Sequence, residues 1–355
     1  MVEQTNGNGQ SPPDFGGHPL EEVPGLQRAS IDALQQFGFS DAEQVVAALT
    51  VPGVMDHLAT ELTLSSAQID DLMLKLRDVV PMAAATADTQ AFALGALPPT
   101  AEIAAIGAAA EQPQIAAEPL PPSVNHADKM SALKQQGSRG TCVSFALTAV
   151  HEYYRRMTED VTEDLSEQFL YHETKLIDGQ PGICGTWQVR AAQILGTLGQ
   201  CLESVWNYNG NPPCNNIGVE PAGARTAASS RKLVTVILAP KDIMGIKTAL
   251  ANGCVVGFSI PVYNSWFQSS EAARTGRITM RIGNEQVNGG HAMCLIGYQD
   301  DAVSPGGGYF ILRNSWFGLW GTECPYGSGN GTIPYAYLAN ENWEAVTTQP
   351  PSGVA

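Results

Sequence analysis

One of the seven cysteines in this 355-residue chain is placed for reactivity rather than for packing. Cys142 follows a loop that contains Gly137 and Gly140, and it opens a stretch in which apolar residues recur at helical spacing. A thiol at a helix N-terminus faces the positive end of the helix dipole, which favours the nucleophilic thiolate. The sequence therefore predicts a helix that begins at Cys142 and marks its thiol as a candidate nucleophile.

Two later segments carry side chains that could act on such a thiol. His291 follows two glycines and begins an apolar run, and Asn314 ends another apolar run. An imidazole can accept the thiol proton, and a third group can orient the imidazole. Taken singly, a histidine at a strand end or an asparagine in a turn is an ordinary structural residue.

The elements that must position these groups lie in the second part of the chain. From about residue 120 to about 345, aromatic residues, all seven cysteines and glycine-bounded β-rich runs predict a mixed α and β domain, followed by a tail at 346–355. Cys254 and Cys294 lie in apolar runs and are expected to be buried thiols. No CxxC pair is present, which argues against a zinc ribbon, and no metal site is predicted.

The first third of the chain has a different character. We expect a disordered tail at 1–19 and a small acidic helical domain at 20–80. Capping patterns at Ser40 and Ser65 precede apolar residues there, and two Val-Pro-Gly turns suggest a helix-hairpin-helix arrangement. Residues 81–118 are rich in Ala, Pro and Thr. They are interpreted either as a flexible linker or as a strand-like segment that lies across the partner domain.

The charge of the chain is concentrated in this first third. The net charge is −16, and residues 1–118 hold three basic residues against sixteen acidic ones. Such a charge repels phosphates and anionic lipids, so neither nucleic acid nor a membrane surface is an expected partner. The N-terminus does not resemble a signal peptide, which predicts a cytoplasmic protein, with export by a non-standard route as the alternative.

Taken together, these segments resemble the papain-like cysteine peptidases. The spacing fits, because His291 lies 149 positions and Asn314 172 positions after Cys142. Three more segments agree with the family, namely Leu120–Asn125, Leu165–Gln168 and Glu203–Tyr208. The resemblance covers roughly residues 119–340. It implies an α+β fold with a helical subdomain that begins at Cys142, a β-barrel-like subdomain that carries His291 and Asn314, and an active site between them.

The resemblance also implies a role for each matching residue. Cys142 would be the nucleophile, His291 its base and acid, Asn314 the group that orients His291, and Gln136 an oxyanion-hole donor. Trp316 would cover the His291–Asn314 contact and line the leaving-group side. Substrate would contact a glycine-containing strip and an apolar pocket for the side chain two residues before the scissile bond; these residues are Gly185, Thr186, Phe258, Gly290 and Ala292. The implied reaction is peptide hydrolysis through an acyl-enzyme, with a protein or peptide substrate and no cofactor.

Some positions depart from the family pattern. Arg139 stands where the family often has a disulfide-forming cysteine, Val143 where it has an aromatic residue, and Gly290 where Asp or Asn often precedes the histidine. The missing anchor disulfide fits a reducing compartment, and a pairing of Cys201 with Cys214 is the one disulfide suggested.

Residues 1–118 do not match the long-helix motif of the family's usual pro-segment. The first hypothesis is an acidic, autoinhibitory pro-domain in which 81–118 crosses the cleft, with electrostatic docking on basic residues such as Arg139. The second is a module that recruits a protein partner to an open peptidase. The third is a catalytically inactive papain-like scaffold that only binds.

Overall fold

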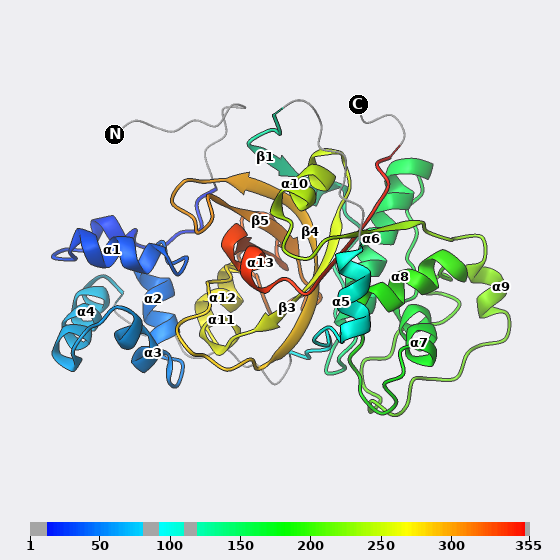
Figure 1. Cartoon of the computed structure of the whole chain (residues 1–355), viewed down its shortest axis with the longest axis horizontal. Helices are drawn as coiled ribbons and strands as arrows, with labels where there is room; N and C mark the ends of the chain where they lie inside the picture. The colour runs from blue at the N-terminus through cyan, green and yellow to red at the C-terminus, as the bar shows by residue number, and fades with distance from the viewer. Residues whose placement is uncertain (1–12, 81–91, 110–118, 352–355) are drawn as a thin grey trace.

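The computed structural model describes residues 13–80, 92–109 and 119–351. Figure 1 shows a curved sheet in the middle of the molecule, with an N-terminal group of helices at one end and a second group of helices at the other. This is an α+β architecture, as the sequence predicts. Among the described residues, no helix is both long enough and apolar enough to cross a membrane.

The central sheet is antiparallel throughout, with the strand order β2-β7-β3-β4-β5-β6, and β1 pairs with β4. Its strands are β1 (Ser123–Asn125), β2 (Thr235–Leu238), β3 (Val256–Val262), β4 (Gly289–Asp300), β5 (Gly308–Arg313), β6 (Asn330–Pro334) and β7 (Glu344–Thr348). Four helices accompany it: α10 (Ile243–Ala251), α11 (Asn264–Phe267), α12 (Ser270–Thr275) and α13 (Tyr335–Glu341). We call this part the sheet subdomain. Because β7 is buried and paired at Thr347 and Thr348, the predicted tail begins too early.

The helical subdomain consists of α6 (Cys142–Glu159), α7 (Glu167–Ile177), α8 (Gln188–Thr197) and α9 (Ala224–Ala228). The long helix α6 begins at Cys142, as its apolar spacing predicts, and its first turns are buried against β4. Its apolar residues share one cluster with the facing side of the sheet, including Val143, Ala292 and Ile311. The two subdomains therefore meet along the face of α6 that carries the thiol.

The N-terminal helices are α1 (Arg28–Gln35), α2 (Ala42–Leu49), α3 (Val54–Glu61) and α4 (Ser66–Val79), and we call them the helical domain. They surround an apolar core of their own. The capping box predicted at Ser65 is present, with Gln68 as its partner. At the other predicted cap, Asp41 rather than Ser40 caps α2 by accepting a hydrogen bond from the Gln44 N–H.

The helical domain docks on α12 and the segment that follows it. The Arg277 guanidinium bonds the carboxylate of Asp41 at 2.5 Å and that of Glu271 at 3.2 Å, and all three side chains are buried. Ile282 from the sheet subdomain completes the apolar core of the helical domain. Docking thus combines one buried ion cluster with shared apolar packing. Arg139, suggested above as a docking point, takes no part in it.

We expect Arg277→Met to loosen the helical domain. The variant leaves the buried Asp41 carboxylate without its cation, which typically costs about 3–5 kcal/mol, whereas Glu271 keeps its ion pair with Arg274. Backbone hydrogen exchange across α2 should therefore rise strongly. The exposed Arg28–Asp32 pair supplies the control, since Arg28→Met should change little. Equal exchange in the two variants would show that the ion cluster does not hold the domain.

Candidate active site

Cys142 is the first residue of α6, and its side chain is fully buried. Its sulfur accepts a hydrogen bond from the Ala292 N–H at 3.3 Å. Burial raises the pKa of this thiol to about 11, although the backbone N–H groups of Ala292 and Gly95 lower it in part. In the resting chain the thiol is therefore protonated at neutral pH, despite its position at a helix N-terminus.

His291 lies in β4, next to Ala292 in sequence, and it is oriented by Asn314 at the end of β5. The two side chains are joined by a hydrogen bond of 2.8 Å between His291 Nε2 and Asn314 Oδ1. The Ser315 N–H donates to the same Oδ1, which identifies this atom as an acceptor, so Nε2 must carry the proton. The other nitrogen, Nδ1, is buried and has no hydrogen-bond partner among the described residues. The arrangement leaves Nδ1 as the free base.

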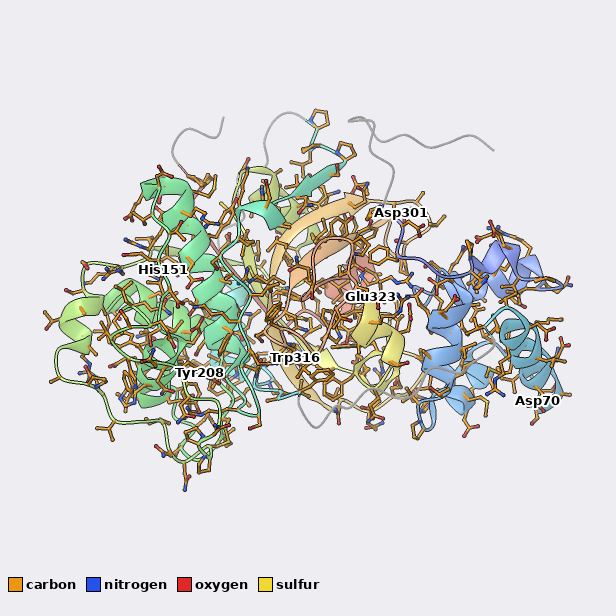
Figure 2. All side chains as sticks on the ribbon, turned by 180° about the vertical axis from the view of Figure 1, so that it is seen from behind. Asp70, His151, Tyr208, Asp301, Trp316 and Glu323 are labelled. Atoms are coloured by element: carbon orange, nitrogen blue, oxygen red, sulfur yellow. A yellow bond between two sulfur atoms is a disulfide. The ribbon has the colours of Figure 1, made fainter. Side chains whose placement is uncertain are left out.

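Burial also keeps the imidazole neutral. It lowers the pKa of His291 to about 4, and the Asn314 bond offsets the effect only in part. Trp316 stacks on the ring, with centroids 4.1 Å apart and planes at 17°. Figure 2 shows Trp316 at the junction of the helical and sheet subdomains. The histidine is therefore held between an amide and an indole that shield it from water.

Gln136 is completely buried beside this group. Its Oε1 accepts from the Ser315 hydroxyl at 2.5 Å, which turns the amide nitrogen toward the loop before Cys142. That nitrogen donates to the Arg139 carbonyl at 2.9 Å and to the Ala93 carbonyl at 3.0 Å. The amide thus already holds a carbonyl oxygen that comes from the N-terminal part of the chain.

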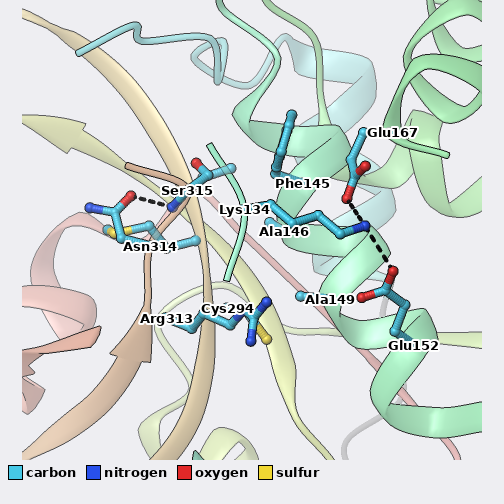
Figure 3. A pocket seen from close by; sticks show the side chains of 12 residues that line it. Lys134, Phe145, Ala146, Ala149, Glu152, Glu167, Cys294, Arg313, Asn314 and Ser315 are labelled. Carbon is cyan, nitrogen blue, oxygen red and sulfur yellow. Dashed lines mark hydrogen bonds and ion pairs between the residues drawn. The ribbon is translucent and has the colours of Figure 1, made fainter. Parts of the chain in front are cut away.

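A buried ion cluster lies behind Gln136 and lines a small cavity. Lys134 bonds Glu152 of α6 at 2.9 Å and Glu167 of α7 at 2.7 Å, and Figure 3 shows Arg313 and Asn314 on the opposite side of the same cavity. Burial raises the pKa of Glu167 to about 8, while Lys134 opposes the rise. The cluster ties the loop that carries Gln136 to both long helices.

Residues 92–98, which we call the strap, lie across these groups. The N–H groups of Gly95 and Ala96 donate to the Gly290 carbonyl at 2.9 and 3.0 Å. The strap also pairs in parallel with Thr186, whose N–H donates to Gly95 and whose carbonyl accepts from Leu97. It is followed by α5 (Ala101–Ala108), which packs near β2. Figure 1 places α5 beside the junction of the two subdomains.

The amino-terminal end of the strap is anchored by an aromatic stack. Phe92 stacks on Trp316 with centroids 4.6 Å apart, and it lies 5.9 Å from Phe267. Trp316 is therefore enclosed between His291 and Phe92. The composition of residues 81–118, which is typical of a linker, does not predict that Phe92 stacks on Trp316.

The predicted substrate residues do not all meet here. Gly185, Thr186, Gly290, Ala292 and Trp316 lie along the strap or beside the thiol. Phe258 does not, because it pairs with Met293 and faces the apolar core of the sheet subdomain. Its neighbour Ser259 pairs with Ala292 instead, and because side chains alternate along a strand, Phe258 and Ser259 point to opposite faces of the sheet.

The disulfide prediction is also wrong. Cys184 pairs with Cys214, while Cys201 is a free thiol buried in a small apolar cluster with Phe169. Two loop cysteines can approach each other, whereas Cys201 is enclosed by packing. Cys254 and Cys294 are buried free thiols, as predicted.

Arg139 serves the loop between Gln136 and Cys142 and does not dock the helical domain. Its guanidinium is buried, bonds the Asn209 and Asn216 carbonyls, and stacks on Tyr171. These carbonyls belong to the loop that Cys214 closes. Arg139 therefore holds the loop before Cys142 against a loop that the Cys184–Cys214 disulfide cross-links.

One group of side chains has metal-like spacing, outside the cleft. One possible ligand atom each of His172, Glu173 and Glu220, a ring nitrogen or a carboxylate oxygen, lies within 4.8 Å of the other two. The Arg225 guanidinium already bonds both oxygens of Glu173 at 2.9 Å, so this carboxylate has its cation. Within the described residues the cleft itself presents no such group.

Comparison with known proteins agrees with this geometry. Residues 120–327 match the papain family cysteine protease domain. An uncharacterized peptidase C1-like protein of Acanthamoeba polyphaga mimivirus is 27% identical over 220 residues, which is 58% of this chain and 65% of that protein. Cysteine protease 1 of Oryza sativa subsp. japonica is 28% identical over 214 residues, 58% of this chain and 40% of its own length. The matches thus span less than two thirds of these relatives.

Solved structures share the fold. Xylellain, a cysteine protease from Xylella fastidiosa, aligns with a TM-score of 0.60 and 23% identity over 73% of this chain and 96% of its own. Digestive procathepsin L 3 of Tenebrio molitor aligns with a TM-score of 0.51 and 17% identity over 91% of this chain and 99% of its own. The domain match spans more than half of the sequence, and the chain therefore belongs to the papain family of cysteine proteases.

Proposed function

We propose that this chain hydrolyses peptide bonds, with Cys142 as nucleophile and His291 as its base. The observation that carries the proposal is the protonation pattern of the imidazole. Asn314 holds the proton on Nε2, and Nδ1 remains unpartnered on a ring whose neighbour, Ala292, contacts the thiol sulfur. A catalytically inactive scaffold would have no need for a buried free base in this position.

The reaction follows from these positions. Nδ1 of His291 takes the thiol proton, and the Cys142 sulfur attacks the substrate carbonyl carbon. The resulting oxyanion accepts hydrogen bonds from the Gln136 amide and the Cys142 N–H. When the tetrahedral adduct collapses, the C–N bond breaks and His291 returns its proton to the leaving amine. Water, deprotonated by His291, then hydrolyses the thioester and restores the thiol.

We further propose that the resting chain is autoinhibited by the strap. The Ala93 carbonyl occupies the Gln136 donor, and Phe92 covers Trp316 on the leaving-group side. A substrate places its acyl part along Thr186 and its leaving group near Trp316. The strap has its amino-terminal end at Trp316 and its carboxyl-terminal end at Thr186, so it runs in the opposite direction. Because the strap runs in the opposite direction to a substrate, none of its peptide bonds is oriented for attack by the Cys142 sulfur. The strap can therefore block the cleft without being cleaved there.

In this proposal the helical domain has a different task. Among its described residues none contributes to the cleft, and its docking site is the Arg277 cluster beside α12. It anchors the chain on one side of the strap, while α5 anchors it on the other through Glu102 and Arg190. Recruitment of a protein partner is the second candidate function, because docking at α12 and the segment after it leaves exposed residues of α1 and α4 free to meet one.

The peptidase proposal is tested with a peptidyl epoxide such as E-64. We expect the probe to attach to Cys142 of the full chain, with the modified residue located by mass spectrometry. His291→Ala should slow labelling by about 10²-fold or more, because the general base is lost. Labelling of another cysteine, or equal rates in the two proteins, would contradict the assignment.

A further inference from the structure

A lysine lies buried beneath Gly185 and Thr186, which we call the strip. Lys175 is in the last turn of α7, and its side chain is 2% exposed. Its ammonium group bonds the Asp178 carboxylate, which is fully buried, at 2.7 Å. The attraction within a buried ion pair offsets its desolvation only when further hydrogen bonds satisfy both groups. The hydrogen bonds that satisfy Lys175 therefore indicate what the pair does.

The other two bonds of the ammonium group go to backbone carbonyls of the loop that leads to the strip. Lys175 Nζ donates to the Gln180 carbonyl at 3.0 Å and to the Gly185 carbonyl at 2.9 Å. Asp178 Oδ1 accepts from the Gln180 N–H at 2.9 Å, so both members of the pair hold the same turn. An ammonium group has three donors, and all three are used here. Lys175 thus ties the beginning of loop 178–185 to its end.

The Gly185 carbonyl belongs to the same peptide group as the Thr186 N–H. This peptide group is trans and planar, so its carbonyl and its N–H point in opposite directions. The Lys175 bond to the carbonyl therefore fixes the direction of the N–H, which donates to the Gly95 carbonyl of the strap at 3.0 Å. A cation on the carbonyl also polarises the peptide group and strengthens its N–H as a donor.

The loop that leads to the strip has little stiffness of its own. Three of its residues are glycines, at positions 179, 182 and 185, and glycine has the widest backbone freedom of any residue. The disulfide between Cys184 and Cys214 holds the side chain next to the strip but does not set the angle of the following peptide plane. Lys175 supplies that orientation from the buried side.

On the basis of the proposed peptidase function, we propose that Lys175 is a positioning residue for substrate, which acts through the peptide group between Gly185 and Thr186. In the resting chain the Thr186 N–H holds the strap. Once the strap has left, the same N–H binds the acyl part of a substrate, because an extended peptide offers the same kind of carbonyl acceptor. Asp178 keeps the ammonium group in place.

The test compares two substrates that differ in how far they extend along the strip. Both are p-nitrophenyl esters with the same residue at the scissile bond. One is an acetylated tripeptide, and the other is an acetylated single residue, whose backbone ends next to the scissile bond. The measured quantity is the ratio of their kcat/KM values. Both substrates need a folded protein with an open strap, so the ratio cancels changes in the folded fraction and in strap opening.

Lys175→Met combined with Asp178→Asn removes both charges, so no buried charge is left unpaired. The asparagine can still accept from the Gln180 N–H. We expect the preference for the tripeptide ester to fall about five- to tenfold, the effect of losing one well-oriented hydrogen bond. The single-residue ester should react at the wild-type rate or a few times faster, because the strap loses part of its hold at the same N–H.

A second variant, Lys175→Gln with Asp178→Asn, keeps polar side chains at both positions and covers the case in which methionine prevents folding. Glutamine is uncharged and one bond shorter than lysine, so the ratio should fall in the same direction. The matched control is Lys247→Met with Asp300→Asn. Lys247 of α10 is also buried and bonds Asp300, at the end of β4, which in turn accepts from the Tyr335 hydroxyl. These hydrogen bonds lie away from the strip, and the control should keep the wild-type ratio.

A purely structural role for Lys175 would lower both rates by one common factor and leave their ratio unchanged. That result, or a wild-type chain with no preference for the tripeptide ester, overturns the inference. Failure of the peptidase proposal looks different, because neither ester would be hydrolysed above its spontaneous rate and the epoxide would not label Cys142.

Discussion

Gly95→Ala is expected to raise the peptidase activity of the full chain about 30- to 100-fold. Gly95 lies against the backbone of Gly140, and a Cβ atom at this position would overlap the Gly140 carbonyl. The φ angle of Gly95 is not positive, so alanine is opposed by this contact rather than by backbone strain. The overlap involves the backbones of Gly95 and Gly140, which cannot move aside as a flexible side chain can. The strap must therefore move away from Gly140.

The magnitude follows from what the strap loses. Six hydrogen bonds and the Phe92 stack hold it, and each such hydrogen bond is worth about 0.5–1.5 kcal/mol. Losing about 2–3 kcal/mol of this total shifts the ratio of open to closed chain by roughly 30- to 100-fold, since 1.4 kcal/mol is a factor of ten. The readout is the hydrolysis rate of a short fluorogenic peptide under identical conditions.

Gly196→Ala is the matched control for this substitution. Gly196 lies in α8, also without a positive φ, and a Cβ there would meet only ordinary contacts, the nearest at 3.7 Å. Its activity should equal that of the wild-type chain. If Gly95→Ala is no more active than Gly196→Ala, the strap does not limit access to the thiol.

Cys142→Ser is expected to reduce peptide hydrolysis by about 10⁴-fold or more. Removal of a nucleophile from such a catalytic group costs most of the rate enhancement, because the remaining groups act only together with it. The serine hydroxyl occupies nearly the same volume, so the buried site keeps its packing. On prolonged incubation wild-type protein should shorten from its N-terminal side by self-cleavage near residues 100–120, while Cys142→Ser should stay at full length.

A second buried thiol provides the comparison for this variant. Cys201 is free, fully buried and also in the helical part of the catalytic domain. Cys201→Ala should retain wild-type activity and self-cleavage. If the Cys142→Ser protein hydrolyses peptide at more than about 1% of the rate of the Cys201→Ala protein, the nucleophile is a residue other than Cys142.

The residues proposed to be catalytic could be picked out from the sequence because each lies in a local pattern. Cys142 follows a glycine-containing loop and opens a helical apolar pattern, and His291 and Asn314 each adjoin an apolar strand. These patterns fixed the elements, and the resemblance to papain-like peptidases related them to one another. The capping box at Ser65 was likewise local and was found in place.

The strap had no such signal. Apart from the Phe92 stack, the strap is held through hydrogen bonds of its own backbone to Gly290, Thr186, the Gln136 amide and the Trp187 indole. Backbone groups are the same in every sequence, and these partners lie far away along the chain. Ala, Pro and Thr in 81–118 were therefore compatible with either a linker or a cleft-crossing segment. Only Phe92, an aromatic residue in a stretch with few of them, distinguishes this part of the chain, and its partner Trp316 is known only from the fold.

Two errors arose from register and pairing. A shift of one residue along β3 exchanges one face of the sheet for the other, and Phe258 lies on the face that packs into the core of the sheet subdomain. Disulfide pairing depends on which loops meet in space, so sequence could not choose between Cys184 and Cys201 as the partner of Cys214.

The central claim is that Cys142 is a catalytic thiol closed off by the strap, and the epoxide labelling rate tests it most directly. Burial sets the pKa of Cys142 near 11 and that of His291 near 4 in the closed chain, so the thiol carries its proton across the range between them. At pH 7 we predict slow labelling of Cys142 in the wild-type chain and labelling at least about 30-fold faster in Gly95→Ala, in line with the opening free energy above. Equal rates in the two proteins, or modification at a residue other than Cys142, would contradict the account.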